Sequence, residues 1–425
     1  MPTSTLNPEQ SAAIIAIQAF LSPEASDQRF FLLSGFAGTG KTYCIRHLID
    51  KIKGRLIFTA PTNKATKVPR DTLTTAEYKP ETRTIYSLLG LRLEANGEVK
   101  ELTIPEDPLD LSEYRAVVVD EASMVNAKLF SFIARTAKEQ KVKFIFMGDS
   151  AQLPPVGETR SPVWDRHDAA ATLTKVMRYD NQILALATAI RGQVDHPAPQ
   201  FRRVSDNANG EGVWNCQEGD FERRLLDAAG QGRFSKPNCA KAIAWRNVTV
   251  DNLNRRIRQR IFDNAASSPW LPDDRIILLE PAKDPQGEPI GSTDDEGTVT
   301  RVESEWHPVW GEFKVWRLSV TTDDNRVIVL RTLDEEFRRA FDTRVEELAQ
   351  AARSDRRRWG AFWKFKEDFH KVRHSYAITA HRAQGSTYEA AFVDWRDILS
   401  NRNRAEAFRC LYVACTRPKF ELYLG

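Results

Sequence analysis

Short apolar segments alternate with helical patterns along the first 160 residues of the chain. Four of these segments, each followed by polar or glycine-rich residues, are RFFLLS (29–34), RLIFTA (55–60), RAVVVD (115–120) and KFIFMG (143–148). Near-continuous apolar strands separated by helices are typical of a parallel sheet covered on both faces. We therefore expect an α/β fold whose functional residues follow the carboxyl ends of the strands.

Two insertions interrupt this alternation. The segment LRLEANGEVKEL (91–102) has an Asn-Gly pair between short arms, which predicts a β-hairpin. After Pro272, four segments rich in β-branched and aromatic residues predict a small β-barrel: DRIILLE, EGTVTRVESEW, GEFKVWRLSV and NRVIVLRT. Helical patterns with a strand at 240–245 precede this barrel, and the α/β alternation resumes with SYAITAHRAQG (375–385).

These changes divide the chain into two α/β domains that carry insertions. The expected divisions are a first domain (1–90 and 113–171), a hairpin (91–112), a second domain (172–272 and 376–425) and a barrel with an aromatic and basic helical arm (273–375).

Composition indicates a soluble globular protein, with 41% hydrophobic and 28% charged residues among 425. No apolar run approaches the ~20 residues of a membrane helix, and no secretory signal is evident. Five cysteines without a CxxC pair favour reduced thiols, so we expect a cytoplasmic protein. A net charge of +3 neither requires nor excludes nucleic acid. The basic stretch 353–374, taken alone, is typical of a solvated helix face.

The segment GFAGTGKT (35–42) matches the phosphate-binding pattern GxxxxGK[ST] between a strand and a helix. Glycines let backbone N–H groups turn toward phosphate oxygens, and the start of the helix favours negative charge. Lys41 is expected to reach the β- and γ-phosphates of ATP, and the Thr42 hydroxyl to bind Mg2+. The predicted phosphate-binding residues are Gly35, Ala37, Gly38, Thr39, Gly40, Lys41 and Thr42.

A pair of carboxylates follows the strand VVVDEAS (117–123). Asp120 is expected to hold Mg2+, and Glu121 to polarise the attacking water as a general base. Elsewhere such a pair would be an ordinary surface feature. Its place after an apolar strand, downstream of a phosphate loop, favours the catalytic interpretation.

Several segments in fixed order resemble the helicase motifs of superfamily 1. They are LIFTAPTNKATKV, TIYSLLG, VVVDEASM, FMGDSAQLPPV, YAITAHRAQG and LYVACTRPKFELYL. The chain is most similar to the RecD-like branch and, within it, to the phage-type Dda helicases, from Leu6 to Leu424. The resemblance implies two RecA-like P-loop domains with parallel sheets, a hairpin insertion and an SH3-like β-barrel insertion. It also implies an ATP-dependent DNA helicase that moves 5′ to 3′ on single-stranded DNA.

The resemblance also implies roles for residues outside the phosphate loop. Arg417 and Arg178 would be arginine fingers, and Gln152 would read the γ-phosphate in a loop ordered by Asp149. Gln10 would read adenine, and Gln384 and Gly385 would contact the phosphates. The implied DNA contacts are Pro61, Thr62, Asn63, Lys64, Thr84, Tyr86, Ser87, Thr379 and His381. Two positions depart from the common pattern: Arg382 stands where lysine is frequent, and Pro418 follows the finger arginine.

The hairpin at 91–102 occupies the place of the family's strand-separating pin, but its polar tip also suits a plain surface hairpin. The arm aromatics Trp359, Phe362, Trp363 and Phe365 could pack the arm or stack on bases, and packing is favoured.

The expected partners are single-stranded DNA and duplex junctions, with a single-strand-binding, replication or repair protein as a further class and a monomer as the active form. Alternatives within the superfamily are an RNA helicase and a 3′-to-5′ translocase. An alternative outside it is a nucleotide-gated clamp or remodeller that binds nucleic acid without unwinding it.

Overall fold

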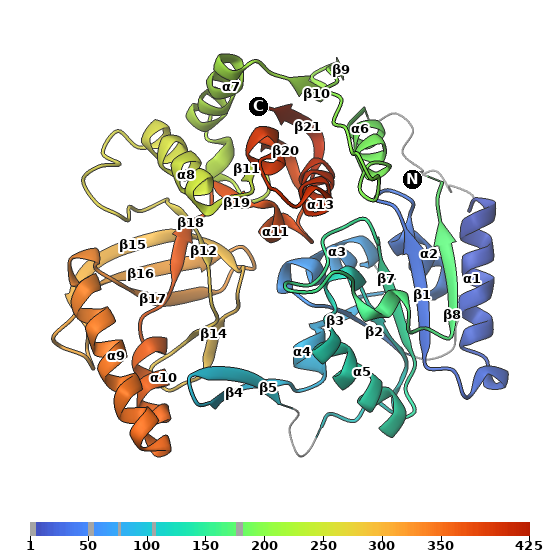
Figure 1. Ribbon diagram of the computed structural model, residues 1–425, viewed down its shortest axis with the longest axis horizontal. Helices are drawn as coiled ribbons and strands as arrows, with labels where there is room; N and C mark the ends of the chain where they lie inside the picture. The colour runs from blue at the N-terminus through green and yellow to red at the C-terminus, as the bar shows by residue number, and fades with distance from the viewer. Residues whose placement is uncertain (1–5, 50–54, 75–77, 104–107, 176–181) are drawn as a thin grey trace.

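The first lobe of the protein is built on a parallel sheet. The computed structural model describes residues 6–49, 55–74, 78–103, 108–175 and 182–425. The six strands lie in the order β3-β2-β6-β7-β1-β8, and every neighbouring pair is parallel. They are β1 (Phe30–Gly35), β2 (Arg55–Ala60), β3 (Glu81–Thr84), β6 (Tyr114–Val119), β7 (Phe144–Gly148) and β8 (Ala169–Leu173). The predicted α/β fold with a parallel sheet is confirmed (Figure 1).

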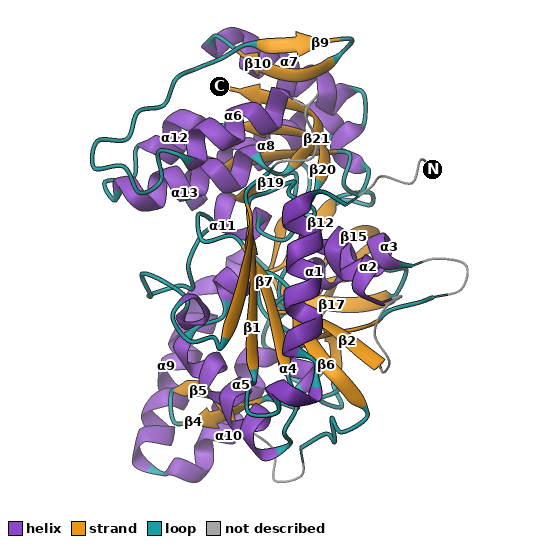
Figure 2. Ribbon diagram, turned by 90° about the vertical axis from the view of Figure 1, so that its right-hand side faces the viewer, coloured by secondary structure: helices purple, strands orange, loops and turns teal. Residues whose placement is uncertain are grey.

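Helices cover both faces of this sheet. Along β6, Ala116 and Val118 pack into one core cluster, whereas Val117 and Val119 pack into another. This alternation sends successive side chains to opposite faces, so a strand buried on both sides must be apolar throughout. The helices are α1 (Pro8–Phe20), α2 (Lys41–Ile49), α3 (Asn63–Leu73), α4 (Ile85–Leu88) and α5 (Ala127–Glu139), with short 3-10 turns at Pro23–Ala25, Ala122–Met124 and Pro162–Trp164. Figure 2 shows α1 lying along the sheet beside β1.

The second lobe repeats this architecture with six strands in the order β19-β11-β20-β21-β10-β9. All pairs are parallel except β9–β10. The strands are β9 (Asp206–Ala208), β10 (Glu211–Asn215), β11 (Ala240–Ala244), β19 (Ala377–Thr379), β20 (Tyr388–Val393) and β21 (Pro418–Leu424). The helices are α6 (Gln182–Arg191), α7 (Glu218–Gly230), α8 (Asn247–Ile261), α11 (Ala380–Ala383), α12 (Trp395–Leu399) and α13 (Arg404–Cys415), with a 3-10 turn at Arg233–Ser235.

Two features of the lobes differ from the sequence expectations. The expected boundary between residues 171 and 172 falls inside β8, whose five residues all pair with β1 of the first sheet. Strands β9 and β10 lie in a region expected to be helical around a single strand at 240–245. The segment DNANGEGVWN (206–215) is short and carries three asparagines and two glycines, so its apolar signal is weak.

The inserted sheet between β11 and β19 is antiparallel and has five strands in the order β17-β16-β15-β12-β18. They are β12 (Arg275–Leu278), β15 (Glu296–Trp306), β16 (Lys314–Thr322), β17 (Val327–Leu333) and β18 (Val372–His374), and a small pair is formed by β13 (Ala282–Lys283) and β14 (Pro289–Gly291). The backbone N–H of His370 donates to Arg331 O at 2.7 Å, and the N–H of Arg331 donates to His370 Nδ1 at 2.8 Å. These bonds join the ends of β17 and β18, so the sheet curls toward closure. The SH3-like class stays a prediction.

The helical arm of the inserted domain packs against the hairpin of the first lobe (Figure 1). The hairpin is β4 (Arg92–Asn96) and β5 (Val99–Thr103), and the arm is α9 (Arg338–Ser354) and α10 (Trp359–Glu367), with 3-10 turns at Glu335–Phe337 and Arg356–Arg358. Trp363 Nε1 donates to Gly97 O at the hairpin turn at 3.0 Å. Phe362 and Phe365 are buried within the arm. The packing interpretation of the arm aromatics is confirmed, and the pin interpretation of the hairpin stays a prediction.

Glu296 joins both lobes to the inserted sheet. Its carboxylate, at the start of β15, pairs with Lys64 of the first lobe and, at 2.8 Å, with Lys241 of the second lobe. Arg275 of β12 lies 3.5 Å away. Burial alone would raise the pKa of Glu296, but these surrounding cations hold it well below its usual range. The carboxylate therefore stays charged at neutral pH and links the three parts of the chain.

Replacing Glu296 by glutamine should destabilise the fold strongly. The change leaves buried cations without this counter-charge, and breaking a buried pair from one side costs about 3–5 kcal/mol. The free energy of unfolding from urea denaturation measures the loss. The matched control is Glu303→Gln on the same strand, where the pairs with Arg301 and Arg317 are partly exposed and should contribute less than about 1 kcal/mol. Equal losses in the two variants would contradict the role of Glu296.

Candidate nucleotide and nucleic-acid site

The phosphate loop (residues 35–42) runs from the end of β1 into the first turn of α2. Gly38 and Gly40 have φ of 78° and 85°, a backbone region that favours glycine. A Cβ at Gly40 would lie 2.6 Å from Gln10 Nε2, which would have to shift, so the backbone conformation is the main reason for glycine there. Lys41 Nζ donates to Gly35 O at 2.8 Å and to Phe36 O at 3.1 Å, which folds the ammonium over the loop.

Gln10 lies against the phosphate loop, but its amide already has partners in the chain. Its Oε1 accepts from the backbone N–H of Asn7 at 3.0 Å, as part of the capping box that starts α1. Its Nε2 donates to Thr39 O at 3.1 Å. Gln10 therefore fastens the start of α1 to the phosphate loop. Adenine reading stays a prediction, and it would use the remaining N–H or an exchange of these bonds.

Asp120 and Glu121 directly follow β6. In the sheet, β6 lies next to β7, and β7 lies next to β1, the strand that leads into the phosphate loop. Glu121 has φ 52° and ψ 46°, an uncommon left-handed conformation for a residue with a side chain. Its backbone N–H donates to Asp120 Oδ1 at 2.8 Å. Burial raises the pKa of both carboxyls, and burial together with Asp120 raises the pKa of Glu121 to about 7. A partly buried, strained carboxylate with a pKa near neutrality suits a general base.

The Gln152 turn (residues 149–152) follows β7 and faces the second lobe. Asp149 is fully buried, and its Oδ1 accepts from the backbone N–H of Ala151 at 3.0 Å. Gln152 Oε1 accepts from Nε2 of Gln384 in the second lobe at 3.2 Å, and the same Nε2 lies 3.0 Å from Ser123 Oγ in the first lobe. A polar cavity of about 320 Å³ beside the turn is lined from both lobes. Gln384 and Gln152 thus meet across the lobe interface.

Arg417 lies just after the end of α13 and is buried in the second lobe. Its guanidinium donates to Ser386 O at 3.1 Å and to Val413 O at 3.0 Å, within its own lobe. Its positive charge nevertheless acts to lower the pKa of Glu121. Its partner Ser386 closely follows Gln384, which contacts Ser123 and Gln152 of the first lobe, so Arg417 lies near the lobe interface. Arg178, the other expected finger, lies outside the described residues.

The helix α13 makes several of the polar contacts between the two lobes. Tyr412 Oη donates to Asp149 Oδ2 at 2.5 Å and accepts from the backbone N–H of Ala37 at 3.2 Å. One turn earlier, Arg409 donates to Gln152 O at 3.1 Å. From α6, Arg191 stacks over the Phe36 ring at 3.4 Å from its centroid and lies 3.4 Å from Asp149. The second lobe thus holds the phosphate loop and the Gln152 turn together.

The residues expected to contact DNA follow the carboxyl ends of β2, β3 and β19. Thr62, Thr84 and Thr379 each cap a helix, because the hydroxyl of each accepts from the backbone N–H three residues later. Around these caps lie the other candidates, Pro61, Asn63, Tyr86 and Ser87. A Cβ at Gly385 would lie 3.0 Å from the Cβ of Ala65, so the loop after Gln384 packs closely on the start of α3.

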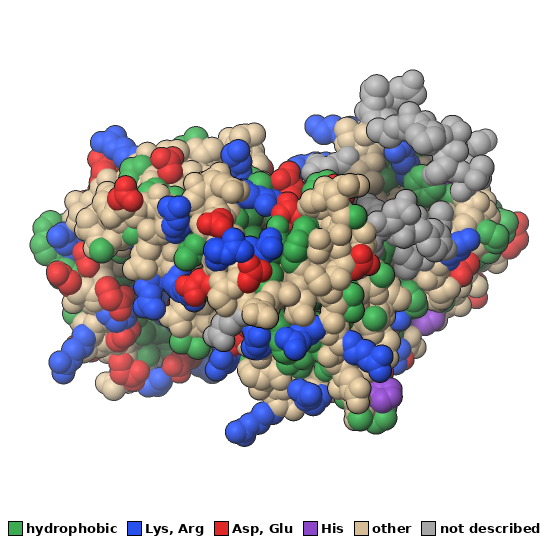
Figure 3. All heavy atoms as spheres, turned by 90° about the horizontal axis from the view of Figure 1, so that it is seen from above, with side chains coloured by type: hydrophobic (Ala, Val, Ile, Leu, Met, Phe, Trp, Pro, Cys, Tyr) green, Lys and Arg blue, Asp and Glu red, His purple; other side chains and the backbone are tan. Residues whose placement is uncertain are grey.

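Two of the DNA candidates have ionic partners within the protein. Lys64 pairs with Glu296, and His381 Nε2 lies 3.6 Å from Glu406 Oε1. Burial lowers the pKa of His381, which favours its neutral form. Binding of these side chains to phosphates would therefore require Lys64 to leave its partner, and for both residues a DNA contact stays a prediction. On the face seen from above, basic side chains are interspersed with acidic ones, consistent with the small net charge (Figure 3).

Sequence reasoning missed Tyr412, Arg409 and Arg191. Tyr412 stands in the apolar run LYVAC, where a tyrosine is typical of core packing, and arginines on helices are usually solvated. A polar atom at the end of a buried aromatic must find a hydrogen-bond partner. That rule could have marked Tyr412, although it could not have named the partner.

Comparisons with known proteins match both lobes. An AAA domain family model matches residues 5–208, and a UvrD-like helicase C-terminal domain model matches residues 374–424. The chain is 27% identical over 428 residues to the ATP-dependent DNA helicase dda of Enterobacteria phage T4, covering 92% of this chain and 93% of the phage protein. It is 24% identical over 477 residues to an uncharacterized protein of Acanthamoeba polyphaga mimivirus, covering 93% and 94%.

Two solved structures share the fold across nearly the whole chain. A Pif1 helicase from Bacteroides in complex with ADP-AlF3 and ssDNA has a TM-score of 0.51 at 17% identity, covering 99% of this chain and 92% of that one. A structure of two coordinating Pif1 helicases at forked dsDNA has a TM-score of 0.52 at 18% identity, with the same coverage of 99% and 92%. The matches to both lobes and the similarity to the phage helicase support a superfamily-1 helicase of the Pif1 and Dda type.

Proposed function

We propose that this protein is an ATP-dependent DNA helicase that translocates 5′ to 3′ on single-stranded DNA and separates duplex strands. The observation that carries the proposal is the lobe interface. Lys41, Asp120 and Glu121 belong to the first lobe, and Arg417 of the second lobe bonds to Ser386, close to the contact of Gln384 with Gln152. A nucleotide bound at such an interface couples its hydrolysis to the relative position of two lobes.

The chain's own residues can supply each part of hydrolysis. Lys41 swings from its loop carbonyls to the phosphate oxygens, and the backbone N–H groups of the phosphate loop hold the phosphates. Glu121, with a pKa near 7, takes the proton of the attacking water. Gln152 orients that water or the γ-phosphate from its turn. Arg417 exchanges its carbonyl partners for the phosphoryl oxygens, where charge develops.

The residues beside the phosphate loop fit a magnesium ion. Thr42 offers a hydroxyl on the first turn of α2, and Asp120 offers the carboxylate oxygen that does not accept from the Glu121 N–H. Oxygen ligands of this kind suit Mg2+, which keeps several waters and binds through one or two protein groups. The ion would neutralise charge on the phosphate oxygens.

Single-stranded DNA is proposed to cross the loops that follow β2, β3 and β19, with the hairpin and its arm at the duplex junction. Support comes from the relatives, whose solved complexes contain ssDNA and forked dsDNA. Cytoplasmic location, action as a monomer and a replication or repair partner also remain proposals. Among the described residues, the helices are too short or too polar to cross a membrane.

The direction of movement is tested by strand displacement on tailed duplexes. Duplexes with a 5′ single-stranded tail should be separated in the presence of ATP and Mg2+, and duplexes with only a 3′ tail should not. An RNA-tailed duplex and a blunt duplex serve as controls. Separation from the 3′ tail alone would overturn the polarity. ATP turnover stimulated by DNA without any displacement would favour the clamp or remodeller.

Arg417→Ala should leave nucleotide binding nearly intact and slow hydrolysis. An arginine finger acts on the transition state, so turnover should fall by about 10³-fold or more. Binding of a fluorescent ATP analogue and single-turnover hydrolysis measure the two effects separately. The matched control is Arg404→Ala at the start of α13, the helix that precedes Arg417. The Arg404 guanidinium is exposed and bonds only to Leu399 O among the described residues, at 3.1 Å. Weaker binding with unchanged turnover of bound ATP would contradict the finger role.

Glu121→Gln should retain nucleotide and DNA binding but lose turnover by about 10²–10⁴-fold, because glutamine cannot accept the proton of the water. Steady-state ATP hydrolysis with saturating DNA measures the effect. Glu139→Gln, at an exposed position of α5 paired with Arg135 at 2.8 Å, is the control and should retain full turnover. A Glu121→Gln variant with near-normal turnover would remove this residue from the mechanism.

A further inference from the structure

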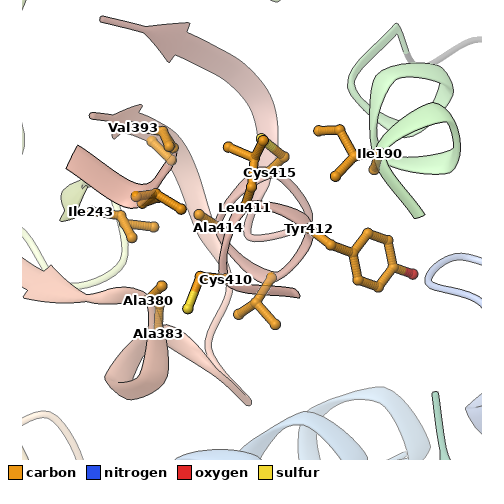
Figure 4. Close-up of a cluster of buried hydrophobic side chains, with 14 of the residues drawn as sticks. Ile190, Ile243, Ala380, Ala383, Val393, Cys410, Leu411, Tyr412, Ala414 and Cys415 are labelled. Atoms are coloured by element: carbon orange, nitrogen blue, oxygen red, sulfur yellow. The ribbon is translucent and has the colours of Figure 1, made fainter. Parts of the chain in front are cut away.

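Tyr412 connects two loops of the first lobe although it belongs to the second. Its ring leaves the buried cluster around α13 and points away from it, toward the other lobe (Figure 4). The side chain is 1% exposed, so its hydroxyl must be satisfied by protein atoms. It is satisfied twice, because the hydroxyl donates to Asp149 Oδ2 at 2.5 Å and accepts from the Ala37 N–H at 3.2 Å.

The two partners of this hydroxyl belong to the nucleotide machinery. Ala37 lies in the phosphate loop, which follows β1. It comes five residues after Leu32 of that strand. Asp149 orders the Gln152 turn, because its Oδ1 accepts from the Ala151 N–H and its carbonyl accepts from the Gln152 N–H at 3.1 Å. The hydroxyl therefore fixes the distance between the loop that holds the phosphates and the turn that carries Gln152.

The bond to Asp149 is of a strong kind. Hydrogen bonds to an ionised acceptor are shorter and about twice as strong as neutral ones, and a low local dielectric strengthens them further. Burial and the nearby Asp149 raise the pKa of Tyr412, so the hydroxyl keeps its proton and stays a donor. Arg191, 3.4 Å from the other carboxylate oxygen, supplies the charge that lets Asp149 remain buried.

We propose that Tyr412 is a positioning residue for ATP hydrolysis. Its hydroxyl holds the Gln152 turn in place relative to the phosphate loop, and this placement depends on contact between the lobes. The inference rests on the proposed function. Tyr412 acts through Ala37 and Asp149, and its hydroxyl reaches them because the two lobes are in contact. When the lobes separate, the hydroxyl leaves both partners and Gln152 loses its fixed position.

The chain contains a matched control for this proposal. Tyr376 is also fully buried in the second lobe. Its hydroxyl donates to Asp274 Oδ1 at 2.8 Å and accepts from the backbone N–H of Arg275 at 3.2 Å. The two tyrosines thus have the same kind of bonds, one aspartate and one backbone amide. Tyr376 makes them within the second lobe and the inserted sheet, away from the phosphate loop.

The experiment compares Tyr412→Phe with Tyr376→Phe in the full chain. Both variants keep the ring and lose a doubly bonded hydroxyl, so both should lower the thermal unfolding midpoint by a similar amount. Only Tyr412→Phe should reduce DNA-stimulated kcat for ATP, by about tenfold, the rate equivalent of one hydrogen bond to a charged group. The KM for ATP should change by less than about twofold, since phosphate binding is not removed.

A double-mutant cycle separates positioning from general loss of structure. Asp149→Asn should also lower DNA-stimulated kcat, and the double variant Tyr412→Phe with Asp149→Asn should be no slower than the slower single variant. Additive losses would overturn the proposal, as would equal kcat for Tyr412→Phe and wild type, or equal kcat losses in Tyr412→Phe and Tyr376→Phe. A wild-type chain without DNA-stimulated ATP turnover would instead overturn the proposed function, and the inference with it.

Discussion

The polar contact between α13 and the loops of the first lobe is the constraint on which the site depends. Arg409 and Tyr412 lie three residues apart, on one face of the helix, and Arg417 follows at its end. The first two hold the Gln152 turn, and the third bonds to Ser386, close to Gln384 at the lobe interface. The opposite side of the helix is packed into the core of the second lobe, so these groups move only as that lobe moves. The proposed nucleotide site has residues from both lobes, so its geometry depends on how far apart the lobes are.

A second junction connects the lobes to the inserted sheet. Glu296 pairs with cations of both lobes, one of which is Lys64, a candidate for binding DNA phosphate. Phosphate and carboxylate are both anions that a buried lysine can take as its partner. Lys64 can therefore pair either with Glu296 or with a DNA phosphate, but not with both at once. The arm and hairpin extend this junction, since Trp363 bonds to the hairpin turn.

The sequence predicted the elements whose signals are local. The strand at 55–60 has the predicted bounds, because its apolar run is continuous and both its faces are covered. Gly38 and Gly40 have the left-handed backbone that a phosphate loop requires. Strand β10 was missed, because glycine and asparagine surround its few apolar residues. The domain boundary at residues 171–172 was misplaced. The apolar pattern of β8, the edge strand of the first sheet, does not show which of the two sheets the strand belongs to.

Contacts across the lobe interface could not be predicted from local pattern. Tyr412 meets Asp149 at a separation of 263 residues and Ala37 at 375, and nothing in the apolar run around Tyr412 distinguishes it from a core residue. Arg191 lies at the end of a helix, where a cation is common for electrostatic reasons alone. Family resemblance supplied Arg417 and Gln384, because their motifs are recognisable. It supplied no partner for Gln10, whose amide is engaged by the chain itself.

We propose that the Arg417 side chain moves from its partners in the second lobe to the nucleotide when the lobes close on it. The most direct test is a crystal structure of the protein with ADP, a phosphoryl transition-state mimic, Mg2+ and an oligonucleotide. We expect the Arg417 guanidinium to leave the carbonyls of Ser386 and Val413 and to bond to the mimic, while Tyr412 still contacts Asp149. A guanidinium that keeps both carbonyl partners and lies out of reach of the mimic would contradict it.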